Sequence, residues 1–210
     1  MGGKLVFAVL LALSGSIGAA SACQSHGTPL LDDSFKTADP GWGQPDNVAA
    51  FTANGLILTA PVSGSAWRWN RSQTMAHNDL CVEVMNPAQL PSPADADTVG
   101  AVGVWFWSTD SQNFYTATIA LDGSVAITRL SGGIWRTITT PAPSPAINTA
   151  PGAVNEIEIV TNGNKASFFV NGAKVQDVQG QAPATGGPPG IYGESGPKGT
   201  SWVFQRVRLF

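Results

Sequence analysis

Short stretches in which apolar and polar residues alternate recur along the whole chain. In residues 79–85, for example, three apolar side chains at every second position alternate with Cys81 and Glu83. A period of two is the pattern of a β-strand with one buried face, and no segment shows the sustained period of 3.6 that predicts a helix. The predicted strands are residues 55–59, 65–70, 79–85, 99–107, 113–121, 124–130, 134–139, 156–160, 165–170, 173–178 and 201–210.

Turn residues separate these segments at short intervals. Asn-Gly pairs at 162–163 and 171–172 favour type I′ turns, which predicts a three-strand meander over residues 156–178. The proline- and glycine-rich segments 86–98 and 181–190 are predicted loops, and the prolines of 141–145 are expected to break regular structure. Many short strands with turns every 8–12 residues are typical of a β-sandwich or a β-barrel, and the last strand is expected to be built into the sheet.

The first 22 residues have the pattern of a secretory signal peptide. Lys4 precedes an apolar run at 5–13, and Ala-Ser-Ala at 20–22 fits the usual cleavage site. No second apolar run of about 20 residues follows, so no membrane span is predicted. We therefore expect an exported, periplasmic or extracellular protein, whose residues 23–210 form a single β-sandwich domain that begins with a tail at 23–30.

The sequence contains two cysteines, Cys23 and Cys81. Cys23 would be the first residue after cleavage, so it is either acylated, as in a lipoprotein, or paired with Cys81. A lipoprotein signal usually carries leucine three residues before the cysteine, whereas Ala20 stands there. The disulfide is therefore favoured. Closing the loop of 57 residues between the two cysteines would stabilise the fold by roughly 3–5 kcal/mol.

The amino-acid composition excludes several classes of protein. Only 12% of the residues are charged, the formal net charge is −3, and 11 lysines and arginines are spread over 210 residues. So few basic side chains cannot form the dense basic surface that nucleic-acid binding needs. Coiled coils and helical bundles need far more charged and helix-favouring residues, so they are excluded as well.

Several motifs resemble those of the concanavalin A-like lectin/glucanase superfamily. They are Phe35 and Trp42, then Asn-Gly-Leu-Ile-Leu at 54–58, Val-Gly-Val-Trp-Phe-Trp at 102–107, Asn-Phe-Tyr at 113–115, Leu-Asp-Gly at 121–123, Asn-Glu-Ile-Glu-Ile at 155–159, Phe-Val-Asn-Gly at 169–172, Gly-Ile-Tyr-Gly at 190–193 and Trp-Val-Phe at 202–204. The chain looks closest to bacterial secreted family 16-like (3-keto-disaccharide hydrolase-type) domains or to laminin-G-like domains. The resemblance covers residues 30–210 and implies an antiparallel jelly-roll β-sandwich.

Glu156 and Glu158 lie on one face of the predicted strand 156–160. Two residues of strand separate their positions by about 6.7 Å, close to the carboxylate spacing of inverting glycosidases. The glucanases of the resembling superfamily use an E-x-D-x-(x)-E strand, but residues 160–162 supply no third carboxylate. We therefore interpret the segment as a structural strand with its isoleucines inward and both charges solvated.

The remaining acidic pairs do not predict a metal site. Asp95 and Asp97 lie in a predicted loop and offer the oxygen ligands that Ca²⁺ prefers, but two carboxylates are too few for its six to eight ligands. Asp32 and Asp33 precede the first predicted strand and are interpreted as turn or capping residues. We predict no bound metal and no cofactor.

Nucleophilic and phosphate-binding motifs are absent from the sequence. His26 falls in the tail, His77 precedes the strand 79–85, and neither accompanies a G-x-S-x-G, H-E-x-x-H or C-x-x-C motif. His77 is therefore interpreted as a surface residue. The glycine-rich run 186–190 lacks the lysine and the following helix of a phosphate loop, which argues against a nucleotide cofactor.

Aromatic residues are the strongest indication of a binding site. Alternation places Trp67 and Trp69 on one face of their strand, and it likewise predicts a shared face for Trp105 and Trp107. Flat rings stack on pyranose rings while polar side chains bond the hydroxyl groups, although the same indoles could fill the core. The predicted saccharide-binding residues are Trp67, Trp69, Trp105, Trp107, Asn113, Tyr115, Arg129, Tyr192 and Glu194.

These observations favour a lectin-like module that binds an oligo- or polysaccharide without catalysis. The first alternative is a glycoside hydrolase-like enzyme acting on a (3-keto-)disaccharide, for which Glu194, expected in a glycine-rich loop beside Tyr192, is the candidate catalytic residue. The second alternative is a structural domain of the cell envelope that binds another protein. The pattern of residues does not decide the oligomeric state.

Overall fold

The computed structural model describes residues 23, 27–77, 79–89 and 100–210 of the chain. The predicted signal peptide, His26, Asp95 and Asp97 lie outside the described residues. Within the described part the chain is almost entirely β-structure, with one short 3-10 helix, η2 (Pro40–Trp42).

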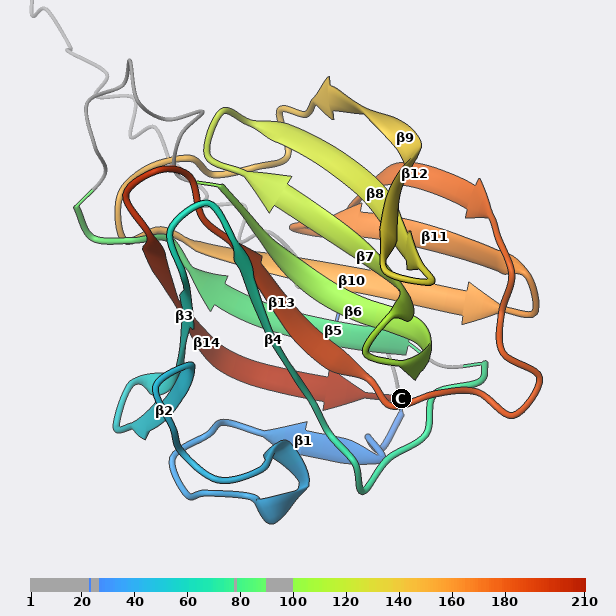
Figure 1. The fold of residues 1–210 in the computed structure, drawn as a ribbon, viewed down its shortest axis with the longest axis horizontal. Coiled ribbons are helices and arrows are strands. Elements are labelled where there is room, and N and C mark those ends of the chain that lie inside the picture. The colour runs from blue at the N-terminus through green and yellow to red at the C-terminus, as the bar shows by residue number, and fades with distance from the viewer. Residues whose placement is uncertain (1–22, 24–26, 78, 90–99) are drawn as a thin grey trace, which may run out of the picture.

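Two antiparallel sheets pack face to face, as the layers in Figure 1 show. Sheet A has the strand order β12-β11-β10-β5-β14-β3-β2, with β1 also paired to β14. Its strands are β1 (Leu31–Asp33), β2 (Ala49–Thr52), β3 (Gly55–Ala60), β5 (Asp79–Met85), β10 (Val154–Asn162), β11 (Lys165–Val170), β12 (Ala173–Gln179) and β14 (Thr200–Leu209).

Sheet B has six strands in the order β4-β13-β6-β7-β8-β9, so β4 and β9 are its two edges. Its strands are β4 (Ser65–Trp69), β6 (Ala101–Asp110), β7 (Asn113–Ala120), β8 (Ser124–Ser131), β9 (Ile134–Pro143) and β13 (Gly190–Glu194). This arrangement is the predicted antiparallel jelly-roll sandwich.

The hydrophobic core lies between the two sheets. Leu80 and Val82 of β5 and Ile157 of β10 pack from sheet A against Val102 and Val104 of sheet B, and all five are fully buried. Each such side chain contributes roughly 1.5–3 kcal/mol by leaving water. The alternation within 79–85 is therefore confirmed, because its apolar positions are the ones that face sheet B.

The meander over residues 156–178 is confirmed as three neighbouring strands, β10, β11 and β12. Its second turn has positive φ at both central residues, 49° at Asn171 and 80° at Gly172, as a type I′ turn requires. Asn171 also accepts a hydrogen bond from the backbone N–H of Glu156 at 2.8 Å and so fixes the turn against β10.

Sequence patterns failed where strands were short or rich in glycine and proline. The strands β1, β2 and β13 were not predicted, and β9 continues through Pro141 to Pro143 although these prolines were expected to end it. Proline lacks the N–H of a ladder bond, but an edge strand such as β9 has one side without a neighbour, so it tolerates the residue.

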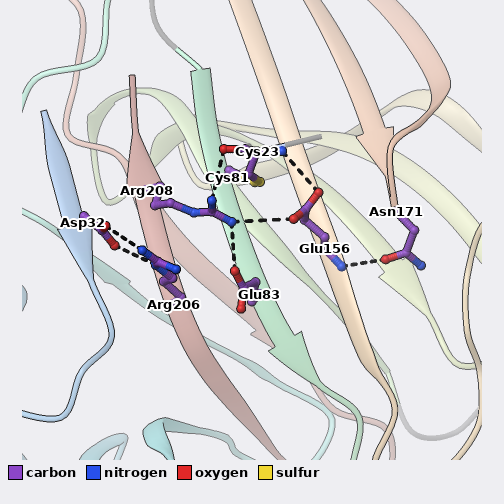
Figure 2. Close-up of a disulfide and its surroundings, with 8 residues drawn as sticks. All are labelled: Cys23, Asp32, Cys81, Glu83, Glu156, Asn171, Arg206 and Arg208. Atoms are coloured by element: carbon purple, nitrogen blue, oxygen red, sulfur yellow. Dashed lines mark hydrogen bonds and ion pairs between the residues drawn. A yellow bond between two sulfur atoms is a disulfide. The ribbon is translucent and has the colours of Figure 1, made fainter. Parts of the chain in front are cut away.

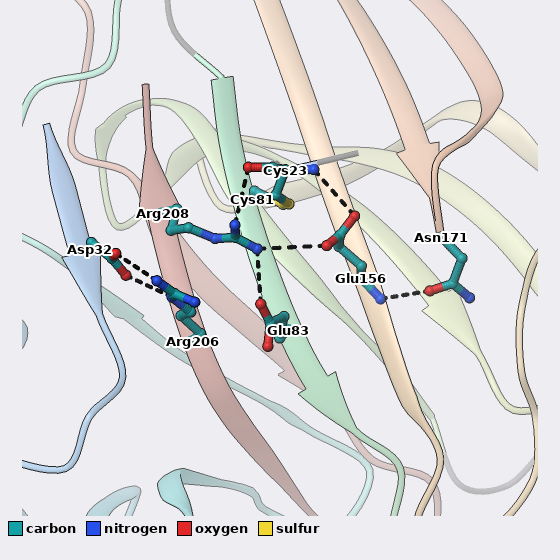
Figure 3. Close-up of polar contacts among 8 residues, drawn as sticks. All are labelled: Cys23, Asp32, Cys81, Glu83, Glu156, Asn171, Arg206 and Arg208. Atoms are coloured by element: carbon teal, nitrogen blue, oxygen red, sulfur yellow. Dashed lines mark hydrogen bonds and ion pairs between the residues drawn. A yellow bond between two sulfur atoms is a disulfide. The ribbon is translucent and has the colours of Figure 1, made fainter. Parts of the chain in front are cut away.

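Cys23 and Cys81 form a disulfide that fastens the beginning of the described chain to β5, as Figure 2 shows. Since these are the only cysteines, neither thiol is left for acylation in this form. Arg208 of β14 lies beneath this segment, and its guanidinium donates to the Cys23 carbonyl at 3.0 Å and to Glu83 at 2.8 Å. A second glutamate, Glu156, lies 3.6 Å from the same guanidinium (Figure 3).

The prediction that the charges of Glu156 and Glu158 are solvated is wrong. Glu158 is only 3% exposed, and Glu156 is covered by the Cys23 segment, whose backbone N–H lies 3.4 Å from its carboxylate. The isoleucines do point inward, as expected. Glu156 is covered because the disulfide holds residue 23 over this face of sheet A, a long-range contact that strand alternation does not encode.

Asp79 belongs to the same acidic face and is also buried. Its burial, its hydrogen bond to Glu158 and the negative charges of Glu158 and Glu156 raise the pKa of Asp79 to about 8. The folded protein therefore holds a proton on Asp79 at pH values where the unfolded chain has lost it, because the ordinary pKa is 3.8.

We predict that stability falls as the pH rises from about 4 to about 8, because the unfolded state binds fewer protons than the folded state over that range. In Asp79→Asn the side chain stays neutral, so this part of the pH dependence disappears and the variant is more stable than the wild type at pH 8. Urea unfolding between pH 5 and pH 9 measures the effect. Asp177→Asn is the control, since Asp177 is exposed and its pKa is lowered by Lys174. A slope that persists in Asp79→Asn would contradict the prediction.

Candidate functional site

The face of sheet B that points away from sheet A carries a continuous layer of aromatic side chains. The alternate residues of the same strands, such as Ala66, Val104 and Ile191, belong to the core between the sheets. Their neighbours therefore project to the outside. We call this layer the aromatic face; it consists of Trp67 and Trp69 of β4, Tyr192 of β13, Trp105 of β6, Phe114 of β7 and Trp135 of β9.

Strand register explains why these rings meet. In one row across the sheet, Trp69 of β4 is paired with Gly190 of β13, which is paired with Trp105 of β6. Because Gly190 has no side chain, the two indoles approach to 5.0 Å between ring centroids. A Cβ atom at Gly190 would lie 3.2 Å from Trp105 and 2.6 Å from the carbonyl oxygen of Arg68. Glycine is thus required at this position.

The rings form two levels. Trp105 and Phe114 stack with centroids 3.5 Å apart and are fully buried, so they form the lower level. Trp67 and Trp69 are partly buried above them, and Trp135 is 45% exposed at the β9 edge. Trp135 meets Phe114 edge-on, with centroids 5.5 Å apart. The buried rings thereby hold the upper indoles in place. Less side-chain entropy is therefore lost when a ligand binds to them.

Polar groups gather at one end of the aromatic face. The hydroxyl of Tyr192 donates to the carboxylate of Glu194 at 2.8 Å. Burial, and then the negative charge of Glu194, raise the pKa of Tyr192 above its ordinary range, so the hydroxyl stays protonated. The two side chains border an open pocket of about 510 Å³, whose lining is Ser63, Gly64, Ser65, Thr128, Trp135, Arg136, Thr137, Tyr192, Glu194 and Ser195.

A second pocket lies at the other end of β4, beside Trp67 and Trp69. It is open, its volume is also about 510 Å³, and its lining includes Arg68 and Asp46. The last two form an ion pair at 2.5 Å. The guanidinium of Arg71 lies 5.6 Å from the ring centroid of Trp69, a cation–π contact. Aromatic surfaces flanked by polar groups therefore extend across sheet B between its two edges.

The structure separates Trp107 from Trp105, so the prediction that they share a face is wrong. Trp107 packs in the core, edge-on against Tyr115 with ring centroids 5.2 Å apart. The cause is an irregularity in the β6–β7 pairing after Phe106, where Trp107 adopts a positive φ of 46°. That backbone conformation interrupts the alternation and turns the indole inward.

Three further predicted residues lie on the opposite side of sheet B from the aromatic face. Tyr115 is buried in the core, and the guanidinium of Arg129 lies 5.0 Å from its ring centroid. Asn113 bridges two turns, because it donates to Asp110 and accepts from the backbone N–H of Gly132. Of the predicted set, the aromatic face therefore brings together only Trp67, Trp69, Trp105, Tyr192 and Glu194.

Sequence reasoning missed two features of the site. Trp135 was not singled out, although the Gly132–Gly133 turn pairs it with Leu130 and so places it on the same face as Phe114. Glu194 was expected in a loop, but it ends β13 inside sheet B and is paired with Ser65. The strand pattern of β13 was hidden because two of its five residues are glycines.

The described residues offer no complete set of metal ligands. Cys23, Cys81 and Glu156 place ligand atoms within 4.8 Å of one another, but the disulfide consumes both sulfur atoms. Asp32 and Asp33 lie in β1 and do not precede the first strand as predicted: Asp32 pairs with Arg206, and Asp33, at the end of β1, accepts from the backbone N–H of Phe35 and from the indole N–H of Trp42. His77 accepts from the backbone N–H of Gly163 on the surface.

A comparison with known protein families identifies the family of this chain. Residues 28–202, most of the sequence, match the family described as 3-keto-alpha-glucoside-1,2-lyase-like domain. The chain belongs to this family. Among curated proteins, none matches the sequence. The resemblance to 3-keto-disaccharide hydrolase-type domains is therefore confirmed.

Solved structures similar to this family member have the same sandwich. The carbohydrate-binding module CBM66 from Bacillus subtilis is 16% identical, with a TM-score of 0.63 over 80% of this chain and 94% of that module. The β-glucanase of Bacillus licheniformis is 15% identical, with a TM-score of 0.60 over 89% and 99%. A family 16 endo-glucanase from Bacteroides ovatus is 11% identical, with a TM-score of 0.59 over 86% and 100%. At these identities they support the concanavalin A-like fold.

Among the residues that the structure describes, no helix combines the length and the hydropathy needed to cross a bilayer. The disulfide Cys23–Cys81 is typical of proteins that reside in an oxidising compartment outside the cytoplasm.

Proposed function

We propose that this protein binds saccharides on the aromatic face of sheet B without acting on them. The observation that carries the proposal is the exposed upper level of indoles, above all Trp135, beside the pocket that contains the Tyr192–Glu194 pair. An indole ring supplies the flat apolar platform that the apolar side of a sugar ring needs, and the carboxylate accepts hydrogen bonds from its hydroxyl groups.

A second candidate function, lyase or glycosidase activity, is favoured by the family to which the chain belongs. Either reaction needs a group that takes up or delivers a proton, and Glu194 is the one carboxylate lining the pocket beside Trp135. Hydrolysis by the usual mechanism uses two carboxylates flanking the bond, and the described lining of this pocket contains no second one. We therefore place binding first. If the wild type released product from a 3-keto-glucoside or a disaccharide and Glu194→Gln did not, enzymatic activity would replace binding as the proposed function.

The test is affinity electrophoresis against a panel of soluble neutral and acidic polysaccharides, followed by titration calorimetry with the best ligand. Trp135→Ala should weaken binding by about tenfold or more, since it removes the most exposed platform. Its effect on the free energy of unfolding should stay below about 1 kcal/mol, because half of the side chain is already in water.

Ile138→Ala is the matched control. Ile138 belongs to the same strand and is 37% exposed, but it is not among the residues that line the pocket. It should leave the affinity unchanged. Retention of no polysaccharide, or equal losses for the two variants, would overturn the proposed site.

A further inference from the structure

The pocket at the far end of β4 is separate from the pocket that contains Tyr192 and Glu194. We call it the β4 pocket; Trp67 and Trp69 line it from sheet B, and residues 43–46 line it from the segment that follows η2. The described linings of the two pockets share no residue. The volume of the β4 pocket, about 510 Å³, lies in the range usual for pockets that hold small ligands. It can therefore hold a ligand of its own.

One wall of the β4 pocket is a stacked pair, Trp69 and Arg71. The guanidinium of Arg71 lies over the indole of Trp69, 5.6 Å from the ring centroid. Both side chains also line a neighbouring hollow of about 310 Å³, and they are the residues that the described linings of the hollow and of the β4 pocket have in common. The pair thus forms a ridge between two open spaces, and a ligand can reach the guanidinium from the β4 pocket.

The backbone that carries Arg71 is fixed from two directions. Asn70 is fully buried; its backbone N–H donates to the carbonyl of Pro189 at 2.8 Å, and its side-chain amide donates to Asp39 at 3.2 Å. The N–H of Arg71 donates to the carbonyl of Gly41 in η2 at 2.9 Å. The guanidinium therefore projects from a rigid base and is held against an indole, so that less entropy is lost when it binds an anion.

Arg71 gives the β4 pocket a positive charge that no neighbour neutralises. The other two charged residues in its described lining, Arg68 and Asp46, form an ion pair with each other. The carboxylate of Asp46 also accepts from the backbone N–H groups of Val48 and Ala49. Arg71 itself forms no ion pair within the part of the chain that the structure describes. Its N–H donors at the β4 pocket are available to an anion from outside the chain.

The neighbouring hollow is less suited to an anion. Asp110 lines it, and hydrogen bonds from the backbone of Gln112 and from the side chain of Asn113 hold the pKa of this carboxyl below its ordinary value. The carboxylate is therefore charged at neutral pH and repels a second negative group. An anionic group that binds Arg71 is directed to the side of the β4 pocket.

We propose that the β4 pocket is a second saccharide subsite and that it takes a sugar bearing a carboxylate, a uronic acid residue. This inference rests on the proposed saccharide-binding function and adds to it a second place and a preference for charge. Trp67, which stacks on Trp105 with ring centroids 5.7 Å apart, supplies the apolar surface for the sugar ring. Arg71 binds the carboxylate through paired charge-assisted hydrogen bonds, which a neutral sugar cannot match.

The experiment measures affinity for polygalacturonate, alginate and hyaluronan, each beside the neutral polymer obtained by reducing its carboxyl groups to alcohols. The two members of a pair have the same glycosidic linkages, so a difference in affinity reports on the carboxylate. The full chain with its disulfide intact should bind at least one acidic polymer about ten- to hundredfold more tightly than its carboxyl-reduced form.

Arg71→Met should lower the affinity for that acidic polymer to the value for the carboxyl-reduced form, and it should leave the affinity for the reduced form unchanged. Lys165→Met is the matched control, because it removes the same charge from an exposed position on sheet A. It should keep the preference of the wild type. Both variants should melt at the wild-type temperature, since both side chains are exposed.

Three results would overturn the inference and leave the proposed function intact. The first is a wild type that binds neutral glycans but prefers none of the acidic polymers over its carboxyl-reduced form. The second is a preference that persists in Arg71→Met. The third is an equal loss for Lys165→Met, which would mean non-specific attraction by net charge. Retention of none of these polymers, nor of any other glycan in the panel, would remove the proposed function itself.

Discussion

Arg208→Met should lower the free energy of unfolding by about 3–5 kcal/mol at pH 7. The guanidinium is buried beneath the disulfide and is shared by Glu83, Glu156 and the carbonyl oxygen of Cys23 (Figure 3). Without it the two carboxylates face each other in a site with little water, and the carbonyl loses a charged donor. Urea unfolding followed by tryptophan fluorescence measures the change.

Arg206→Met is the matched control, because Arg206 lies on the same strand two residues earlier. It forms a bidentate bond to Asp32 with both distances at 2.7 Å, but both side chains are more than a third exposed. An exposed pair of this kind contributes less than about 1 kcal/mol. The difference between the variants should shrink near pH 3, where glutamates become protonated. Equal losses at pH 7 would contradict the structural role assigned to Arg208.

Removing the disulfide should have an effect of similar size. Cys23 and Cys81 are 58 residues apart, and in the chain-entropy model a loop of that length contributes about 4 kcal/mol. Cys23→Ser/Cys81→Ser should therefore melt well below the wild type. The loss is expected to exceed the entropic value, because a released residue 23 also withdraws its carbonyl from Arg208 and its N–H from Glu156.

Thermal unfolding with and without a reductant checks this prediction. The reductant should lower the melting temperature of the wild type toward that of the double variant and leave the variant itself unchanged. In a double-mutant cycle, Arg208→Met should cost less in the variant without the disulfide than in the wild type, because one of its partners is already gone. A wild type that is insensitive to reduction would contradict the prediction.

Sequence patterns predicted the parts of the fold that depend on neighbours along the chain. Alternation located β5, β10, β11 and β12 within one or two residues, and the Asn171–Gly172 pair located a turn whose backbone those two residues favour. The shared face of Trp67 and Trp69 was also predictable, since β4 is regular. In each case the interaction that determines the structure joins residues that are only a few positions apart in the sequence.

The parts that failed depend on residues distant in the sequence. The positive φ at Trp107 turns its indole to the other side of the sheet, and no local sequence pattern predicts that backbone conformation. The alternation of its strand predicts a solvated Glu156, but the disulfide places residue 23 over that carboxylate. Trp135 becomes part of a site only because β9 pairs with β8 in the register that sets it beside Phe114.

The sequence by itself thus determined the all-β class and favoured the pairing of the two cysteines, because periodicity, turn chemistry and the number of thiols are local or countable properties. The choice of a sandwich over a barrel came from the family resemblance. The tertiary structure alone decided which rings and which charges share a surface. That depends on strand order and register, which place β4, β13, β6, β7, β8 and β9 side by side although their residues span positions 65 to 194. The aromatic face exists only after those strands have paired.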